Sequence, residues 1–304
     1  MSFSEEQVIE VLAEVFGSRD PRVLIGIGDD AALVRGSAQQ ILTTDVAVEG
    51  VHFRSDWSTA FEIGQRIAAA NIADVLAMNG KCDCLLVAAT LTGSESLEWI
   101  KGLAQGIQEQ AALAGAVVVG GDLARSQTLS ITITAVGHSD HVIRRSGAKP
   151  GDTIYLSSLT GWSAAGLLML ERDMKFSEKA IARYKVPQLD HSIDFSNATS
   201  MSDVSDAVLI QGAQMAKASD VGFSLHLMML EKADGFDELF ELSKKMGADV
   251  LEWILQGGED HVLLATGREL PGIAIGTVYE GSGISLVHNM KEIEMAPVSW
   301  SHFK

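Results

Sequence analysis

The pattern of apolar and polar residues predicts helices and strands mixed along the whole chain. Apolar side chains at helical spacing predict helices at 4–16, 61–78, 95–114, 163–171, 207–218, 235–246 and 249–255, with one more in the polar stretch 173–200. Apolar runs and period-two alternation predict strands at 23–25, 41–48, 85–91, 116–119, 129–135, 154–158, 223–230, 261–266, 272–279 and 284–288. Because both halves mix strands with helices, the pattern favours two α+β domains.

A polar stretch between His138 and Pro150 separates the two halves. It contains the adjacent pair Arg144-Arg145, the most concentrated positive charge between two acidic halves, which suits either a phosphate contact or a solvated turn. We place the domain boundary here, with residues 1–138 as the N-terminal domain and 139–304 as the C-terminal domain. A length of 304 residues suits two domains of about 150 residues each.

The composition of the chain indicates which binding partners and which cellular location to expect. Lys+Arg 23 against Asp+Glu 40 gives a net charge of −17, so neither nucleic acid nor a membrane is expected as a partner. The N-terminus lacks the features of a signal peptide, and no apolar run approaches the roughly 18 residues of a membrane span. Cys82 and Cys84, the two cysteines, are spaced poorly for a disulfide or a zinc site. We therefore expect buried thiols in a cytoplasmic protein.

The first candidate for chemistry is the glycine-rich segment that follows the strand at 23–25. Gly26, Gly28 and Ala31 superficially match a dinucleotide-binding loop, in which helix-start amides hold a pyrophosphate. Asp29 and Asp30 would then repel the phosphates. A divalent cation between carboxylate and phosphate turns that repulsion into attraction, so the loop suits a metal–phosphate site.

Other acidic residues also stand at the ends or in the middle of apolar segments. Thr43-Thr44-Asp45 offers three hard oxygens for magnesium, although a solvent-facing Asp45 fits the pattern equally well. Asn71 and Asp74, at positions i and i+3, share one face of their helix. Asp74 is either a metal ligand or a buried hydrogen-bonded acid. The remaining acids of this kind are Asp122, Asp203, Asp206, Glu259 and Asp260. For Asp203 and Asp206 the alternative is capping of the helix that follows.

If these acids converge, their mutual repulsion implies several bound magnesium ions. The sequence contains no GxxxxGK[ST], no kinase glycine-rich loop with Val-Ala-Ile-Lys, no GxSxG and no HExxH, which excludes the enzyme classes that carry those motifs. Phosphoryl transfer with metal ions as the main phosphate ligands remains.

Six motifs, in this order along the chain, resemble those of the thiamine-monophosphate kinase family. They are GIGDDAA (26–32), TTD (43–45) with VEGVHF (48–53), NIAD (71–74), GGD (120–122), RSGAKPGD (145–152) and GGED (257–260). The resemblance runs from about residue 20 to the C-terminal WSHF (300–303). The first and fourth motifs alone would indicate only the wider superfamily of aminoimidazole-ribonucleotide (AIR) synthetase and selenophosphate synthetase.

The resemblance implies a two-domain, AIR synthetase-like α+β fold with a C-terminal α/β sandwich. It implies a homodimer whose N-terminal sheets pair, and magnesium-dependent transfer of the ATP γ-phosphoryl group to thiamine monophosphate, giving thiamine diphosphate and ADP. The acceptor phosphate, with a second pKa of about 6, is mostly ionised at neutral pH. No residue is therefore expected to act as a general base, and the enzyme must align and neutralise two anions.

By motif position the resemblance assigns three sets of site residues. The implied metal ligands are Asp29, Asp30, Thr43, Thr44, Asp45, Asp74, Asp122, Asp203 and Asp206, with Asp29 the weakest of them. The implied ATP contacts are Gly121, Asp122, Arg145 and Ser205. The implied thiamine site contains His52, Glu259 and Trp300, and a carboxylate and an indole face suit the cationic thiazolium.

The chain departs from the family pattern at Ala73, Asn79, Ala207 and His261, where family members usually carry Ser, Gly, Gly and Tyr. Every implied ligand is retained, so we expect activity, with a shifted metal affinity or turnover as an alternative outcome. Two other functions stay open at this point. One is a superfamily relative that activates an amide or acyl oxygen with ATP, and the other is a non-catalytic protein that binds magnesium and nucleotide.

Overall fold

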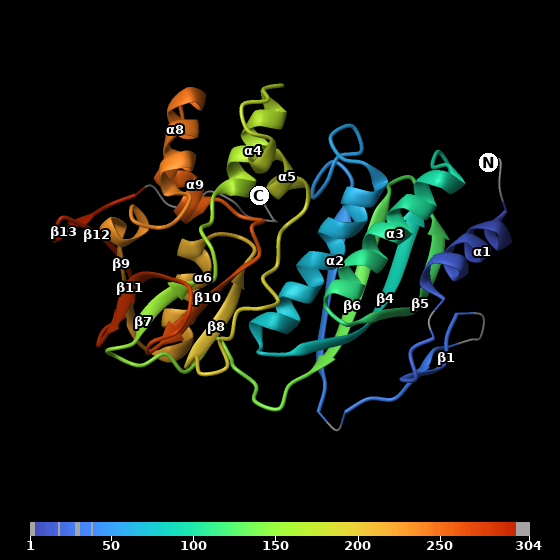
Figure 1. Ribbon diagram of the computed structural model, residues 1–304, viewed down its shortest axis with the longest axis horizontal. Helices are drawn as coiled ribbons and strands as arrows, with labels where there is room; N and C mark the ends of the chain where they lie inside the picture. The colour runs from blue at the N-terminus through green and yellow to red at the C-terminus, as the bar shows by residue number, and fades with distance from the viewer. Residues whose placement is uncertain (1–3, 18, 28–30, 38, 296–304) are drawn as a thin grey trace. The chain divides into compact units, whose positions relative to one another are not determined.

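The computed structural model describes residues 4–17, 19–27, 31–37 and 39–295. The chain divides into two compact units (Figure 1). The first comprises Met1–Leu76 and Gly80–Asp140, and the second Ala77–Asn79 and His141–Lys304. Among the helices of the described part, none is both long enough and apolar enough to cross a membrane.

The first unit is built on a four-stranded sheet in the order β3-β6-β4-β5. Strands β4 and β5 are parallel, and the other neighbours are antiparallel. The described elements of this unit are α1 (Glu5–Phe16), β1 (Val23–Ile25), β2 (Leu33–Val34), β3 (Ile41–Val48), α2 (Ala60–Ala77), β4 (Lys81–Leu91), α3 (Leu97–Leu113), β5 (Val117–Arg125) and β6 (Ser130–His138).

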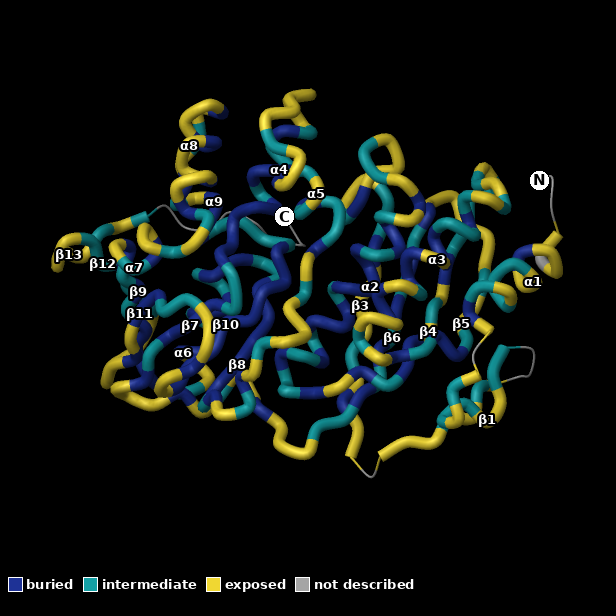
Figure 2. Tube along the Cα trace, in the orientation of Figure 1, coloured by how far each residue is buried: buried dark blue, intermediate teal, exposed yellow. Residues whose placement is uncertain are grey.

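The two faces of this sheet differ in burial, as Figure 2 shows along the chain. On β6, Ile131, Ile133 and Ala135 are fully buried and alternate with half-buried residues, as the period-two pattern predicts. The register places Leu42 and Val46 of β3 on the opposite face, where both side chains are exposed. One face of the sheet therefore forms a core, while the other presents apolar side chains.

Helices α2 and α3 cross with their backbones in contact. A Cβ atom on Gly106 would lie 2.0 Å from the carbonyl oxygen of Phe61, and one on Gly64 would lie 2.2 Å from that of Leu103. Only glycine leaves room for this crossing. It fixes the position of α2, which carries the candidate metal ligand Asp74 and its neighbour Asn71.

Cys82 and Cys84 lie on β4, and both are free and buried. Burial raises the pKa of the Cys82 thiol to about 12, so this thiol is unreactive at neutral pH. The prediction of buried thiols rather than a disulfide is confirmed.

The second unit contains a seven-stranded sheet in the order β13-β12-β9-β11-β7-β10-β8. The β12/β9 pair is parallel, and the others are antiparallel. The elements are β7 (Thr153–Leu156), α4 (Trp162–Glu171), α5 (Glu178–Lys185), β8 (Ser200–Val204), α6 (Val208–Ser219), β9 (Gly222–His226), α7 (Leu227–Leu230), α8 (Phe236–Met246), α9 (Val250–Gln256), β10 (Val262–Gly267), β11 (Ile273–Tyr279), β12 (Gly283–His288) and β13 (Lys291–Ile293).

The α+β class predicted from the sequence is confirmed, with two local corrections. The strand predicted over 223–230 ends at His226, and α7 follows it. Leu227 and Leu230, three residues apart, are both buried, and that spacing is helical rather than alternating. The strand β8 was also missed, because the polar side chains within it hide the strand pattern.

Candidate functional site

A first group of candidate residues lies where β3 faces α2. The Thr43 hydroxyl donates a hydrogen bond to Asp74 Oδ2 at 2.6 Å, and the Asp45 amide donates to Asn71 Oδ1 at 3.1 Å. Asn71 is fully buried and donates in turn to the Ile67 carbonyl at 2.9 Å. The structure thus brings together three oxygen-bearing residues, Thr43, Asp45 and Asp74, that the sequence associated with magnesium.

Thr44 and Asp122 lie elsewhere on the same sheet. Thr44 pairs with Thr134 and points to the face opposite Thr43, where its hydroxyl lies 3.0 Å from that of Thr134. Asp122, on β5, pairs with Ala88 of β4, and two strands separate β5 from β3. Three strand spacings amount to about 14 Å. Within one chain, the sheet therefore does not bring Asp122 to Thr43.

Gly121, an expected ATP contact, has a structural reason to be glycine. A Cβ atom there would lie 1.8 Å from the Val87 carbonyl oxygen of the neighbouring strand. Three other expected site residues, Asp29, Asp30 and Trp300, lie outside the described residues.

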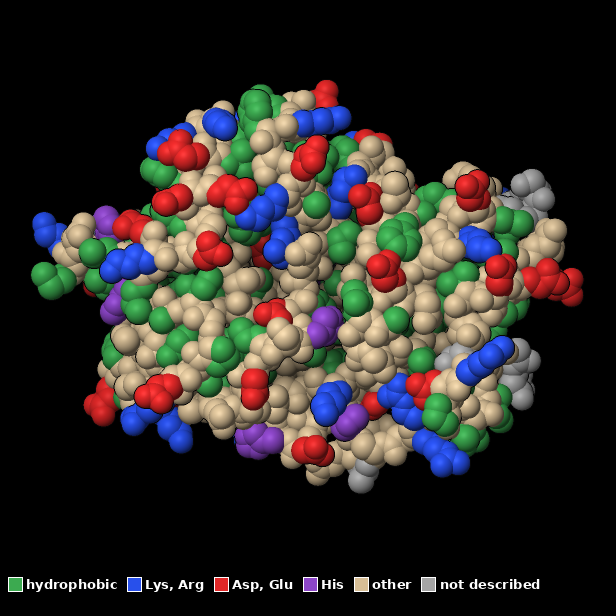
Figure 3. All heavy atoms as spheres, in the orientation of Figure 1, with side chains coloured by type: hydrophobic (Ala, Val, Ile, Leu, Met, Phe, Trp, Pro, Cys, Tyr) green, Lys and Arg blue, Asp and Glu red, His purple; other side chains and the backbone are tan. Residues whose placement is uncertain are grey.

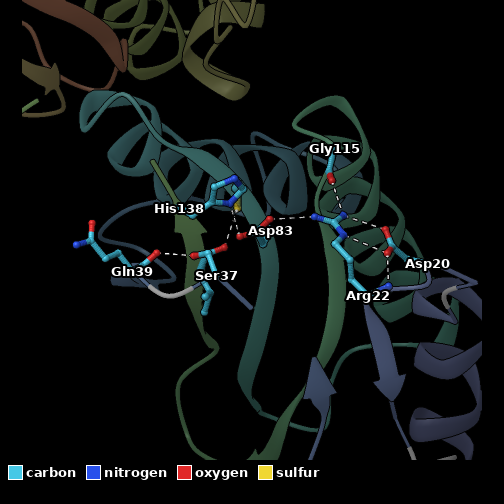
Figure 4. A network of polar contacts seen from close by, with 9 residues as sticks. Asp20, Arg22, Ser37, Gln39, Asp83, Gly115 and His138 are labelled. Atoms are coloured by element: carbon cyan, nitrogen blue, oxygen red, sulfur yellow. Dashed lines mark hydrogen bonds and ion pairs between the residues drawn. The ribbon is translucent and has the colours of Figure 1, made fainter. Parts of the chain in front are cut away.

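The chain leading to the glycine-rich segment is anchored by an ionic network (Figure 4). Arg22 donates to both carboxylate oxygens of Asp20, to Asp83 Oδ1 at 3.0 Å and to the Gly115 carbonyl at 2.8 Å. Asp83 Oδ2 lies 2.7 Å from His138 Nδ1. The hydrogen bonds from Arg22 lower the pKa of Asp20 to about 2. Sequence reasoning did not find this network, since its members are scattered over more than a hundred residues.

His52, an expected substrate contact, stands in the turn after β3. Its amide donates to the Val48 carbonyl at 2.9 Å, and its Nδ1 accepts from the Val48 amide at 3.1 Å. Because Nδ1 is an acceptor in this turn, the ring presents Nε2 as its hydrogen-bond donor.

A second group of candidate residues forms in the other unit, where the loop after β8 meets the loop before β10. The Glu259 amide donates to the Ser205 carbonyl at 2.7 Å, and the His261 amide donates to the Val204 carbonyl at 3.0 Å. A Cβ atom on Gly258 would lie 2.5 Å from the Asp206 carbonyl oxygen, so glycine permits this close approach. Two strands far apart in sequence therefore place Ser205, Asp206 and Glu259 side by side.

Asp206 does not cap helix α6. The N-cap of α6 is Ala207, and its side chain makes no capping hydrogen bond. Instead, Gln211 accepts from the Ala207 amide at 2.9 Å and donates to Asp206 Oδ2 at 3.1 Å. Asp203 lies within β8. The capping interpretation of Asp203 and Asp206 is wrong, because a glutamine inside the helix takes that role.

His261 inserts its ring between two carboxylates. Its Nδ1 lies 3.4 Å from Asp203 Oδ2 and its Nε2 lies 3.7 Å from Glu259 Oε2. Both His261 and Asp203 are buried. Burial lowers the pKa of His261, but the carboxylates of Asp203 and Glu259 raise it further, to about 10. The two carboxylates therefore favour the charged form of the ring.

Asp260, which stands between Glu259 and His261 in the sequence, has a structural role. Its buried carboxylate accepts from the Gly161 amide at 2.6 Å and from the Ser163 amide at 3.0 Å, at the start of α4. Burial raises its pKa to about 6, although these two hydrogen bonds lower it.

Arg145, an expected ATP contact, is exposed and donates to Gln214 of α6 at 3.1 Å.

The first group of candidate residues offers suitable ligands for a metal ion. Thr43, Asp45 and Asp74 offer hydroxyl and carboxylate oxygens, the ligands that magnesium prefers. Among the residues that the structure describes, no three His, Cys, Asp or Glu side chains enclose an ion. The oxygens of this group fit magnesium if water and phosphate oxygens complete the shell.

The chain is similar to known proteins over most of its length. Residues 28–139 match the family described as AIR synthase related protein, N-terminal domain. The thiamine-monophosphate kinase of Mycobacterium tuberculosis H37Rv is 35% identical over 259 residues, covering 83% of this chain and 77% of that protein. The crystal structure of the Stenotrophomonas maltophilia K279a thiamine-monophosphate kinase has a TM-score of 0.80 at 27% identity, covering 94% of this chain and 97% of that chain. A structure of AaThiL complexed with AMPPCP and TMP has a TM-score of 0.78 at 28% identity, covering 98% and 97%.

Proposed function

The chain belongs to the thiamine-monophosphate kinase family and transfers a phosphoryl group from ATP to thiamine monophosphate, and we propose that magnesium ions held by its acidic side chains assist this transfer. The observation that supports the metal site best is the contact between Thr43 and Asp74. It joins a strand and a helix through two oxygen-bearing side chains beside Asp45.

The proposed magnesium ligands in the first unit are the oxygens of Thr43, Asp45 and Asp74, with Thr44, Asp122, Asp29 and Asp30 carried over from the resemblance. Asp206 is the proposed ligand in the second unit. Magnesium, when bound, neutralises the negative charge shared by the two phosphate groups. The Thr43 hydroxyl holds the Asp74 carboxylate through one proton, so its lone pairs stay available to an ion.

The remaining site residues hold the two substrates. Gly121, Asp122, Arg145 and Ser205 are proposed to contact ATP, and His52, Glu259 and Trp300 to contact thiamine monophosphate. No residue is assigned as a general base. The residues align donor and acceptor phosphates rather than remove a proton.

We also propose a homodimer formed through the first unit. Leu42, Val46 and Leu86 are exposed on one face of its sheet, and a second copy would cover them. The cytoplasmic location predicted from the sequence belongs to this proposal. Nucleic acid and membranes are not among the proposed partners, and Lys and Arg are interspersed with Asp and Glu on the face shown in Figure 3.

Incubation with ATP, thiamine monophosphate and MgCl2, with ADP and thiamine diphosphate measured, tests the proposal. We expect product formation that requires magnesium and falls at least about a hundredfold in D45N and D74N. The matched control is E14Q, which removes an exposed carboxylate paired with Lys101. ATP binding without thiamine diphosphate would favour a non-catalytic nucleotide-binding protein. ADP formed with an amide or acyl acceptor instead would favour the superfamily relative. Normal turnover of D45N would refute the metal assignment.

A further inference from the structure

Three buried polar atoms in the second unit have no hydrogen-bonding partner of good geometry. They are Asp203 Oδ2, His261 Nδ1 and His261 Nε2. Asp203 is 2% exposed and His261 6% exposed, so both side chains are closed off from bulk solvent. Unpartnered buried polar atoms are costly, and these three converge where the His261 ring faces Asp203.

A magnesium ion does not fit between Asp203 and His261 as they stand. An ion bound to Asp203 Oδ2 would lie about 2.1 Å from that oxygen. The His261 ring begins 3.4 Å away on the same side. An ion there would either collide with the ring or take its nitrogen as a ligand, and magnesium prefers oxygen.

The backbone holds the ring in this place. Glu259 and His261 both adopt left-handed conformations, with φ of 66° and 51°, which cost energy for residues with a side chain. The His261 amide is fixed to the Val204 carbonyl at 3.0 Å, directly after Asp203 in β8. The loop therefore aims the ring at both carboxylates despite strain.

We propose, on the basis of the proposed function, that the His261 ring bridges Asp203 and Glu259 in the place that a metal ion would take, so that Asp203 does not bind magnesium in this chain. His261 is then a positioning residue. Its Nε2 lies 3.7 Å from Glu259 Oε2, and the ring reduces by one the metal ions that the second unit holds.

The test counts bound Mn²⁺ by electron paramagnetic resonance in the full chain, with MnCl2 as the probe. Four proteins are compared, namely wild type, D203N, H261Y and H261Y/D203N, each checked for folding by circular dichroism. We expect D203N to bind as many ions as wild type, with affinity changed by less than about twofold. We expect H261Y to gain one ion or to bind about tenfold more tightly, and H261Y/D203N to lose that gain.

Loss of an ion in D203N alone would overturn the inference, and this arm does not depend on whether H261Y folds. A histidine ¹⁴N coupling in the wild-type Mn²⁺ spectrum that disappears in H261Y would also overturn it, because the ring would then be a ligand. The result is separable from the proposed function. Formation of thiamine diphosphate and its sensitivity to D45N report on the kinase, whereas the ion count of D203N reports on His261.

Discussion

Substitution of Gly106 by alanine should loosen the crossing of α2 and α3 and with it the metal site. The added methyl would lie 2.0 Å from the Phe61 carbonyl oxygen and 2.9 Å from its carbon. Both of these are backbone atoms, which cannot rotate away. Since an ordinary contact needs at least about 3.2 Å, the two helices must separate by about 1 Å.

The expected cost follows from two opposing effects. Overpacking of this kind costs about 1–3 kcal/mol, while alanine gains up to about 1 kcal/mol over glycine inside a helix. We expect G106A to lose about 1–2 kcal/mol of unfolding free energy, or a few degrees in Tm. Because Asp74 is on α2, its distance from Thr43 should increase, and the magnesium concentration for half-maximal activity should rise.

Gly102, one turn earlier in α3, provides the matched control. A Cβ atom there would meet the Ala60 Cβ at 3.5 Å, an ordinary contact, so G102A should keep or gain stability. Urea unfolding followed by circular dichroism measures both variants, and hydrogen exchange of α2 amides reports the local effect. Equal stability of G106A and G102A would refute the close crossing.

Two further predictions concern hydrogen-bonded carboxylates. T43V removes the hydroxyl that donates to Asp74 at 2.6 Å, so the magnesium requirement should rise about tenfold, whereas T43S should restore it; an unchanged magnesium titration of T43V would contradict this role. Asp260, with its pKa raised from 3.8 to about 6, favours the folded state below pH 3.8, and this contribution is lost as the pH rises through about 6. Relative to D260N, wild type should therefore lose up to about 3 kcal/mol of unfolding free energy over that range, and parallel urea-unfolding profiles of the two proteins would contradict the shift.

The local part of the site in the first unit is predictable from sequence. The i, i+3 spacing of Asn71 and Asp74 places both on one helix face, and the hydroxyls before Asp45 indicate a polar break in a strand. The alternation of side chains along a strand already places Thr43 and Thr44 on opposite faces of the sheet. The pairing of β3 with β6 is not local information, and it sets Thr44 opposite Thr134 and Thr43 opposite Ala135.

In the second unit, sequence motifs indicate the residues but not their contacts. Asp203 and Glu259 both approach the His261 ring because β8 pairs with β10, although these segments are about sixty residues apart in sequence. The polar sequence of β8 conceals a fully buried strand. His261 is recognisable as a departure from the family pattern, but its burial between two acids depends on left-handed backbone that no periodicity indicates.

The position of Asp122 leads to the last prediction, which concerns the proposed dimer. β3 and β5 are the two edges of their sheet, and sheet edges invite pairing with another chain. If β5 of one copy joins β3 of the other, Asp122 of one chain comes beside the Thr43-Thr44-Asp45 segment of its partner.

D45N and D122N should then each be inactive alone but complement one another when their subunits are mixed. Half of the random dimers contain one chain of each kind and hold one intact site, so about a quarter of the wild-type rate should return. The control is a mixture of D45N and D74N, because both residues lie in the same group of one chain, and no activity should return. If D45N and D122N also fail to complement, the shared site is refuted, since two acids serving one site within a single chain cannot be rescued by exchange.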